Sequence, residues 1–181
     1  MKMLLLKSAL IAGAVALSSN VLAHGGATGI VKERMDQMVD MKHAMKAVAP
    51  MFRGKLPYDA EQVRKSAAII ESVAGSAMTD KFPEGSMGHG TDAKVNIWQE
   101  WDKFQSLSDD LKRYSKALGE ASERREKVAA KPASMMGGSS MMGAAKPAVD
   151  QPLSELSADR LFKMVTDSCS SCHRRFREDK K

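Results

Sequence analysis

Cys169-Ser170-Ser171-Cys172-His173, near the carboxyl end of the 181-residue sequence, is the stretch that decides the fold. Two cysteines three positions apart, with a histidine directly after the second, form the pattern of covalent haem attachment. Two thiols must add to the two vinyl groups on one edge of the porphyrin, and the histidine must then reach the iron. On a helix, positions i, i+3 and i+4 share one face. Because residues 156–179 have the apolar spacing of an amphipathic helix, we predict that Cys169 and Cys172 hold one haem c and that His173 is its proximal ligand.

The same residues have three simpler interpretations: a disulfide, a redox dithiol or half of a zinc site. These are the only two cysteines, so a four-ligand zinc site would need distant histidines. A redox Cys-x-x-Cys of the thioredoxin type follows a strand in a βαβ unit, and the sequence has no such pattern. The histidine directly after the second cysteine favours haem attachment over a disulfide.

Residues 1–23 have the pattern of a secretory signal peptide. Lys2 and Lys7 precede an apolar run over residues 9–17, and Val21-Leu22-Ala23 provides small residues for cleavage. The apolar run is too short to span a membrane. We therefore predict export to an oxidising compartment, in bacteria the periplasm, and a single domain over residues 24–181.

Composition limits the function classes. Aromatic residues make up 5% of the chain, so aliphatic side chains, the 14 methionines and the haem itself must fill the core. The formal net charge of +6 is dispersed, with no block of like charge that would indicate nucleic-acid binding. A weak attraction to acidic redox partner proteins is compatible with this charge.

Apolar residues recur at three- and four-residue steps in four segments, and no segment alternates with the period of a strand. The predicted helices cover residues 30–52, 60–79, 93–130 and 156–179. Asp59 is a predicted helix cap, Gly119 a predicted kink or early helix end, and the Gly- and Pro-rich residues 82–91 a loop. Four amphipathic helices joined by loops predict an all-α, antiparallel four-helix bundle.

Residues 132–152 interrupt this pattern. They combine glycine, serine and proline with Met135, Met136, Met141 and Met142, which is the composition of a flexible insert. Thioethers also favour Cu(I), and Met87, His89 and His24 could join them. A flexible linker and a copper site are thus both compatible with the insert.

Only eight residues follow the haem motif, so upstream helices must cover the other face of the haem and supply any sixth iron ligand. Methionine and histidine are the usual ligands in electron-transfer haems. His24 and His89 lie in glycine-rich stretches, and His43 is turned about 140° from Met38 on a helical wheel. Met38 lies on the apolar stripe of the first helix, as do other methionines for which core packing is the simpler role.

The chain resembles the cytochrome c-prime family of monohaem class II c-type cytochromes. The similarity rests on a haem motif close to the carboxyl end and on three upstream patterns, which together cover nearly all of the chain after residue 23. These patterns are Arg34-x-x-x-Met38, Gly54-x-x-Pro57-Tyr58 and Ile97-Trp98-x5-Phe104. The resemblance implies a four-helix bundle in which the last helix holds the haem and the first faces its distal side.

The resemblance also implies site residues. Low-spin members have a distal methionine, and Met38 falls at that position; high-spin members have an apolar residue there and leave the iron open to nitric oxide or carbon monoxide. Arg34 and Arg177 would lie near the haem edge, where the alternative is ordinary solvated charge. Trp98, Phe104 and Phe176 would pack in the core or against the haem. Family members often form homodimers through their first two helices.

We therefore expect a periplasmic electron carrier with His173 and Met38 as axial ligands, acting on redox partner proteins. The alternative is a five-coordinate haem protein that binds nitric oxide or carbon monoxide. An enzyme is not expected, because the sequence has no placed distal acid–base pair.

Overall fold

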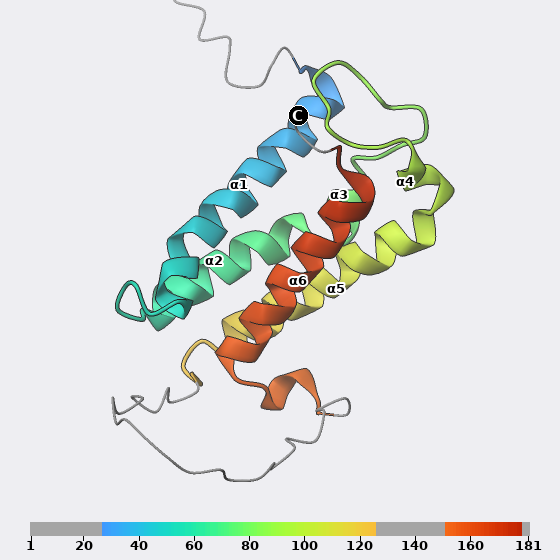
Figure 1. Cartoon of the computed structure of the whole chain (residues 1–181). Coiled ribbons are helices and arrows are strands. Elements are labelled where there is room, and N and C mark those ends of the chain that lie inside the picture. Colours follow the sequence, from blue (N-terminus) through green and yellow to red (C-terminus); the bar gives the residue numbers. More distant parts are fainter. Residues whose placement is uncertain (1–26, 126–150, 179–181) are drawn as a thin grey trace, which may run out of the picture.

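The computed structural model describes residues 27–125 and 151–178, and these are helical apart from loops and one isolated β-bridge. The predicted signal peptide over residues 1–23 and most of the predicted insert, residues 132–150, lie outside the described residues. In chain order the elements are α1 Gly29–Phe52, α2 Ala60–Val73, α3 Ser76–Thr79, α4 Asn96–Gln99, α5 Trp101–Glu120, the 3-10 turn η1 Leu153–Glu155 and α6 Ala158–Phe176 (Figure 1).

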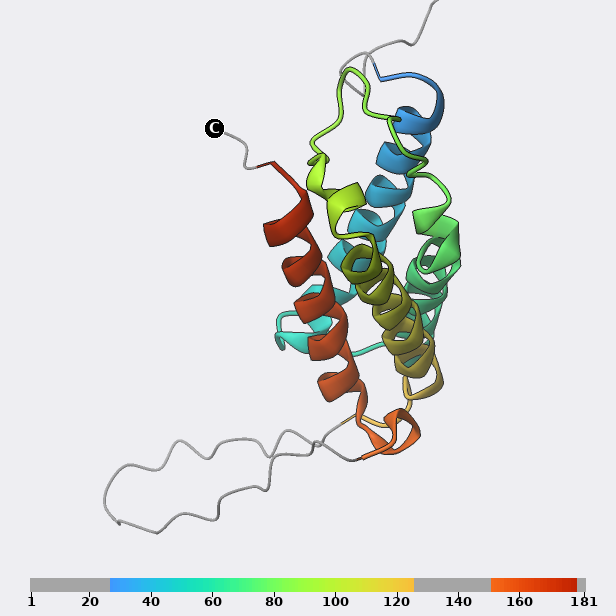
Figure 2. The same cartoon turned by 90° about the vertical axis from the view of Figure 1, so that its right-hand side faces the viewer.

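The four long helices form an antiparallel bundle, as predicted. α1 packs on α2, α2 on α5, and α5 on α6, and consecutive long helices run in opposite directions (Figure 1). In the turned view α5 lies between α2 and α6 (Figure 2). α1 and α6 are not among the closely packed helix pairs. They meet at one end, where the rings of Phe52 and Phe162 stack with centroids 4.0 Å apart.

Aliphatic side chains from all four long helices fill the core. Completely buried members include Val48, Val63, Ile70, Leu118, Leu161 and Val165. Towards the end of the bundle where α6 finishes, Phe104 contacts both Phe82 and Phe176 edge-on, at centroid distances of 4.9 and 5.5 Å. One group of aromatic residues thus lies near the end of α6, and a second group, with Phe52, Tyr58 and Phe162, lies where α1 meets the start of α6.

The second predicted helix is interrupted, which corrects the single helix expected over residues 60–79. Its start is as predicted, because the Asp59 side chain accepts a hydrogen bond from the Gln62 amide at 3.0 Å. It ends at Val73, and Gly75 adopts a φ of +68° before α3 begins. The Gly75 amide donates to the Ser108 hydroxyl at 2.9 Å, and a Cβ at Gly75 would lie 2.7 Å from the Lys112 Cδ atom. The glycine therefore allows α5 to approach this break closely.

The third predicted helix is shorter than expected. Glu100, with φ −124° and ψ 40°, separates α4 from α5. α5 ends at Glu120 rather than near residue 130, so Gly119 marks the early end that was one of its two predicted roles. Residues 93–95 lie outside any helix.

Residues 80–95, which connect α3 to α4 and are called the strap below, lie at the end of the bundle where α1 begins and α6 finishes (Figure 1). On one side the strap contacts α1, since a Cβ at Gly88 would lie 3.2 Å from the Val31 Cγ2 atom. On the other side it pairs with the end of α6. The Lys94 amide donates to the Phe176 carbonyl at 2.9 Å, and the Glu178 amide donates to the Asp92 carbonyl at 2.7 Å.

Within residues 27–125 and 151–178, none of the helices combines the length and the apolar character that crossing a membrane requires.

Candidate haem site

The helix α6 presents the three residues of the motif on one face. Ser157 caps its first turn by accepting a hydrogen bond from the Arg160 amide at 3.3 Å, and the helix continues unbroken through the motif to Phe176. Cys169, Cys172 and His173 are all half-buried, and both cysteines are free thiols packed against the hydrophobic core. The arrangement predicted from the spacing is therefore present.

The surroundings of the thiols hold them in the neutral form. Burial raises the pKa of both cysteines, that of Cys172 to about 11, with the neighbouring Cys169 a second cause. A reactive redox dithiol needs the opposite, because its attacking cysteine has a lowered pKa and is present as a thiolate. The electrostatics of the site therefore disfavour the redox interpretation of the motif.

The surroundings of His173 favour its neutral form. Its burial, and secondly the positive charge of Arg177, lower the pKa of the imidazole. The Arg177 Nη1 atom lies 3.5 Å from His173 Nδ1, one helical turn further on. Nε2 is then the nitrogen available to a metal ion, and a neutral imidazole is the form that binds one.

Met38 packs against the core from α1. It is half-buried and packs against the hydrophobic cluster that also includes Cys169 and Cys172. Met45, two turns further along α1, shares this position, whereas Met41 is a buried core residue with 7% of its surface exposed. His43 is exposed. Met38 and the two cysteines thus face the same core, which has members from all four long helices, and the assignment of Met38 as the iron ligand stays a prediction.

Arg34, one turn before Met38, is not a solvated charge, because only 3% of its surface is exposed. Its Nε atom donates to the Lys81 carbonyl and its Nη2 atom to the Ser86 hydroxyl. Its Nη1 atom donates to the Ser86 carbonyl at 3.1 Å, and the guanidinium lies 4.2 Å from the centroid of the Phe82 ring. Arg34 therefore fastens the strap to α1, a role that the sequence analysis missed. Contact between Arg34 and the haem edge stays a prediction.

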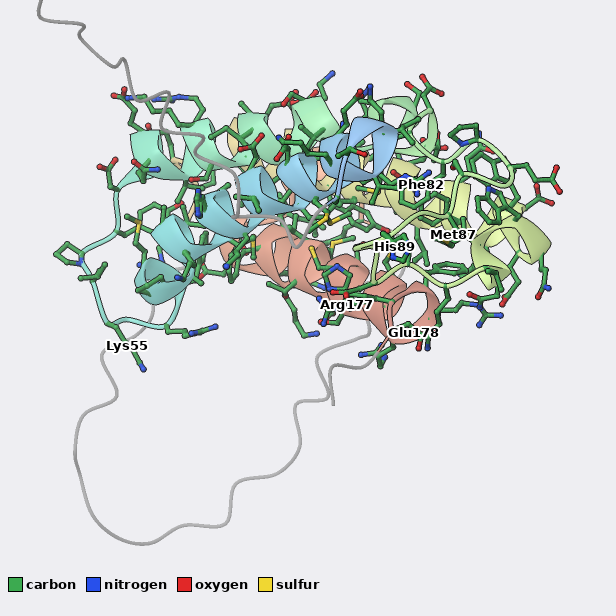
Figure 3. All side chains as sticks on the ribbon, turned by 90° about the horizontal axis from the view of Figure 1, so that it is seen from above. Lys55, Phe82, Met87, His89, Arg177 and Glu178 are labelled. Atoms are coloured by element: carbon green, nitrogen blue, oxygen red, sulfur yellow. The ribbon has the colours of Figure 1, made fainter. Side chains whose placement is uncertain are left out.

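Arg177, in contrast, is exposed at the end of α6 and faces His173. Figure 3 shows Met87 and His89 on the strap, toward the end of α6 that carries Arg177 and Glu178. His89 itself is exposed. Contact between Arg177 and the haem edge stays a prediction. No such contact was predicted for His89.

The three aromatic residues predicted to pack in the core or against the haem all lie in or against the hydrophobic core. Phe104 and Phe176 are buried, with 2% and 3% of their surfaces exposed. Trp98 is half-buried, and its indole N–H donates to the Phe82 carbonyl at 2.9 Å.

The donor set fits a covalently attached haem. Two neutral thiols and a neutral imidazole share one half-buried face of α6, and the two helices that would enclose the group, α1 and α6, are not packed closely on each other. A thioether on the opposite helix completes the set of residues that such a group requires.

Comparison with known proteins gives a consistent result. The family model described as Cytochrome C' matches residues 29–140. A cytochrome c-556 from Agrobacterium tumefaciens (strain II Chrys) is 36% identical over 83 residues, which are 46% of this chain and 66% of that protein, just under two thirds of its length. A cytochrome c' from Pararhodospirillum photometricum is 28% identical over 138 residues, or 74% of this chain and 84% of that protein.

The fold is similar to solved structures. A cytochrome c' from Rhodopseudomonas palustris superimposes with a TM-score of 0.62 at 23% identity, covering 86% of this chain and all of that one. A nitric oxide complex of the L16A mutant of cytochrome c prime from Alcaligenes xylosoxidans gives a TM-score of 0.58 at 21% identity, covering 83% and 94%. At these identities the likeness supports the fold.

Proposed function

Because the chain belongs to the cytochrome c' family, we propose that it is a carrier of single electrons rather than an enzyme. Its cofactor is haem c, as in the family. In this proposal Cys169 and Cys172 form the two thioether bonds, His173 is the proximal iron ligand and Met38 is the distal one. The observation that supports the proposal is that Met38 on α1 and the two cysteines on α6 all pack against the hydrophobic core between the helices.

The residues around the iron would make electron transfer fast, because their protonation and their bonds to the iron would change little between the two oxidation states. The bound haem supplies the one-electron chemistry between ferric and ferrous iron. His173 stays neutral because burial and Arg177 lower its pKa, so it can keep its lone pair on the metal in both oxidation states. Met38, on a 24-residue helix fastened at Arg34, would fill the sixth position and exclude other ligands.

The place of action is part of the proposal. A cleavable signal peptide over residues 1–23 would export the chain to the periplasm, where c-type haem is attached in bacteria, and the carrier would exchange electrons with redox partner proteins there. The name of the relative from Agrobacterium tumefaciens, cytochrome c-556, is compatible with a carrier.

A second candidate function is the binding of nitric oxide or carbon monoxide at an open distal site. Relatives named cytochrome c' favour it, as do structural neighbours described as a nitric oxide complex and a carbon monoxide-bound variant. In this alternative Met38 would be a core residue that does not bind the iron.

Replacing Met38 by Ala tests the assignment. If the Met38 sulfur binds iron, the variant keeps its covalent haem and His173, but the ferric iron turns high-spin and carbon monoxide binds the ferrous form more readily. The reduction potential falls, because methionine ligation favours the reduced state. Absorption and electron paramagnetic resonance spectra report these changes.

The matched controls are Met35, Met41 and Met45, each replaced by Ala. Met41 is buried in the core, and its truncation lowers the free energy of unfolding by about 2–5 kcal/mol while the spin state is unchanged. If Met38→Ala keeps the wild-type low-spin spectrum and one of the controls loses it, the ligand is the other methionine.

A further inference from the structure

A surface pocket of about 400 Å³ lies where the strap leaves α3 and passes α4 and the start of α5, and none of the predicted haem ligands or haem-edge residues lines it. Its lining residues include three aromatic and two acidic residues, namely Phe82, Trp98, Trp101, Asp80 and Glu84. None of the sequence motifs discussed above accounts for this combination.

The aromatic part of the pocket is held in place. Trp98 and Trp101 are the only tryptophans of the chain, and both are half-buried, so each keeps part of its ring at the surface. The indole N–H of Trp98 is already used by the Phe82 carbonyl, at 2.9 Å. The Trp101 ring rests against buried Phe104, with centroids 5.6 Å apart. The pocket therefore offers indole surface that the fold fixes and does not cover.

The charged residues that line the pocket are both acidic. Asp80 and Glu84 are exposed, and neither forms an ion pair or a side-chain hydrogen bond with the residues that the structure describes. Lys81, between them in sequence, is bound to Glu33 at 2.6 Å instead. Among the residues that the structure describes, no basic side chain lines the pocket, and the nearby Arg34 guanidinium lies against the Phe82 ring, with 3% of the residue exposed.

We propose that this pocket binds a cationic group, either an alkylammonium or a guanidinium. The face of an indole attracts a cation through its quadrupole, and two unpaired carboxylates at the rim would add a direct charge interaction. An anion would face repulsion from the same carboxylates. The group could belong to a small quaternary ammonium compound or to a Lys or Arg side chain of a partner protein, since both share this chemistry. The inference does not depend on which residue binds the haem iron.

The two indole N–H signals provide a direct readout. We would titrate the reduced, carbon monoxide-treated protein, which is diamagnetic whichever distal ligand the wild type has, and record ¹H–¹⁵N spectra. The probes are tetramethylammonium chloride and a short neutral-backbone peptide with one arginine, each compared with sodium chloride at equal ionic strength. We expect saturable shifts of both signals with at least one probe and none with sodium chloride.

The Asp80→Asn, Glu84→Gln double variant removes both carboxylates at exposed positions, so the fold is preserved. We expect its affinity for the cation to fall by about tenfold. The matched control removes two exposed carboxylates that do not line the pocket, Asp40→Asn with Glu120→Gln, and should bind as the wild type does.

A second variant, Trp101→Leu, removes one ring and keeps both charges, and is expected to abolish saturation. Saturation by tetramethylammonium indicates a small-cation site, and saturation by the arginine peptide alone indicates a side chain of a partner protein. Shifts that stay linear with both probes, or equal affinities for the two double variants, would overturn the proposal.

Discussion

At the scale of single residues, burial decides which chemical form the site residues take. Both cysteines are held as thiols and His173 as a neutral imidazole, in each case chiefly because the group is removed from water. The attachment of a haem and the ligation of its iron use these groups at neighbouring positions of one helix. Arg177, beside the His173 Nδ1 atom, is the only charge that the structure places directly against the imidazole among the described residues.

Tyr58 gives a pH-dependent prediction at this scale. Its hydroxyl donates to the Ser122 carbonyl at 2.6 Å, and burial, followed by the charge of Asp159, raises its pKa from 10.0 to about 12. A pKa that is higher in the folded than in the unfolded state means that the neutral hydroxyl stabilises the fold below pH 10, and that this contribution is lost as the pH rises from 10 to 12.

The variant Tyr58→Phe should therefore be less stable than the wild type at pH 8, by about 1–2 kcal/mol for the unpaired carbonyl, and the difference should shrink above pH 10. Urea unfolding at pH 8, 10 and 11, followed by circular dichroism, measures it. A difference that is the same at pH 8 and pH 11 would show that Tyr58 does not titrate as described.

The arrangement of the haem-motif residues could be predicted because all three lie on one helix, where their spacing in the sequence determines which face they share. The spacing places Met38 on the core side of α1 but does not separate it from Met45, and the structure packs both against the core. The burial of Arg34 was not predictable. Its acceptors at Lys81 and Ser86 follow 47 and 52 residues later in the sequence, and a single sequence carries no signal for such a contact.

At the scale of elements, the strap connects the helix that carries Met38 to the helix that carries His173. Arg34 holds it on α1, and backbone hydrogen bonds from Lys94 and Glu178 hold it on α6. Because α1 and α6 do not pack closely on each other, these contacts contribute to setting the separation of the two helices.

Replacing Arg34 by Met should lower the free energy of unfolding by about 2–3 kcal/mol, because buried acceptors on Lys81 and Ser86 lose their charged donor. The Lys94 and Glu178 amides should exchange their hydrogens faster, since the strap is released at one end. The control is Arg53→Met at an exposed position after α1, with an expected change within about 0.5 kcal/mol. Equal effects of the two substitutions would mean that Arg34 does not fasten the strap.

The sequence predicted the helix ends that are set by nearby residues. It did not predict those that are set by packing between helices. Asp59 caps α2 through its own side chain, and Gly119 precedes the end of α5 by one residue. The break at Gly75 was missed because residues 73–74 continue the apolar pattern. The cause of the break is its contact with Ser108 and Lys112 on α5, more than thirty residues away.

At the scale of the whole molecule, the site depends on two helices at opposite ends of the chain. α1 begins at Gly29 and α6 ends at Phe176, so the bundle must close before Met38 and the haem motif come together. The number of long helices follows from the four amphipathic segments, and their antiparallel order is the usual one for such a bundle, although only the connection between α1 and α2 is short. The position of α1 relative to α6 does not follow from these segments, because that position depends on the strap.

The predicted insert over residues 132–152 should be dispensable for the site, since every candidate site residue lies on α1, on α6 or directly after it. Replacing residues 132–150 with a short Gly-Ser link should leave the haem spectrum unchanged. A changed spectrum would contradict this, as would stoichiometric Cu(I) binding by the wild type that is lost when Met135, Met136, Met141 and Met142 are replaced.

The most direct test of the proposed carrier is the absorption spectrum of the wild-type protein in both oxidation states, after expression in a host that attaches c-type haem. With His173 and Met38 both on the iron, the ferric protein should be low-spin and show the weak long-wavelength band of thioether–iron ligation, and the ferrous protein should bind carbon monoxide only slowly. A high-spin ferric spectrum with rapid carbon monoxide binding would contradict the account: the distal position would be open, and gas binding would replace electron transfer as the proposed function.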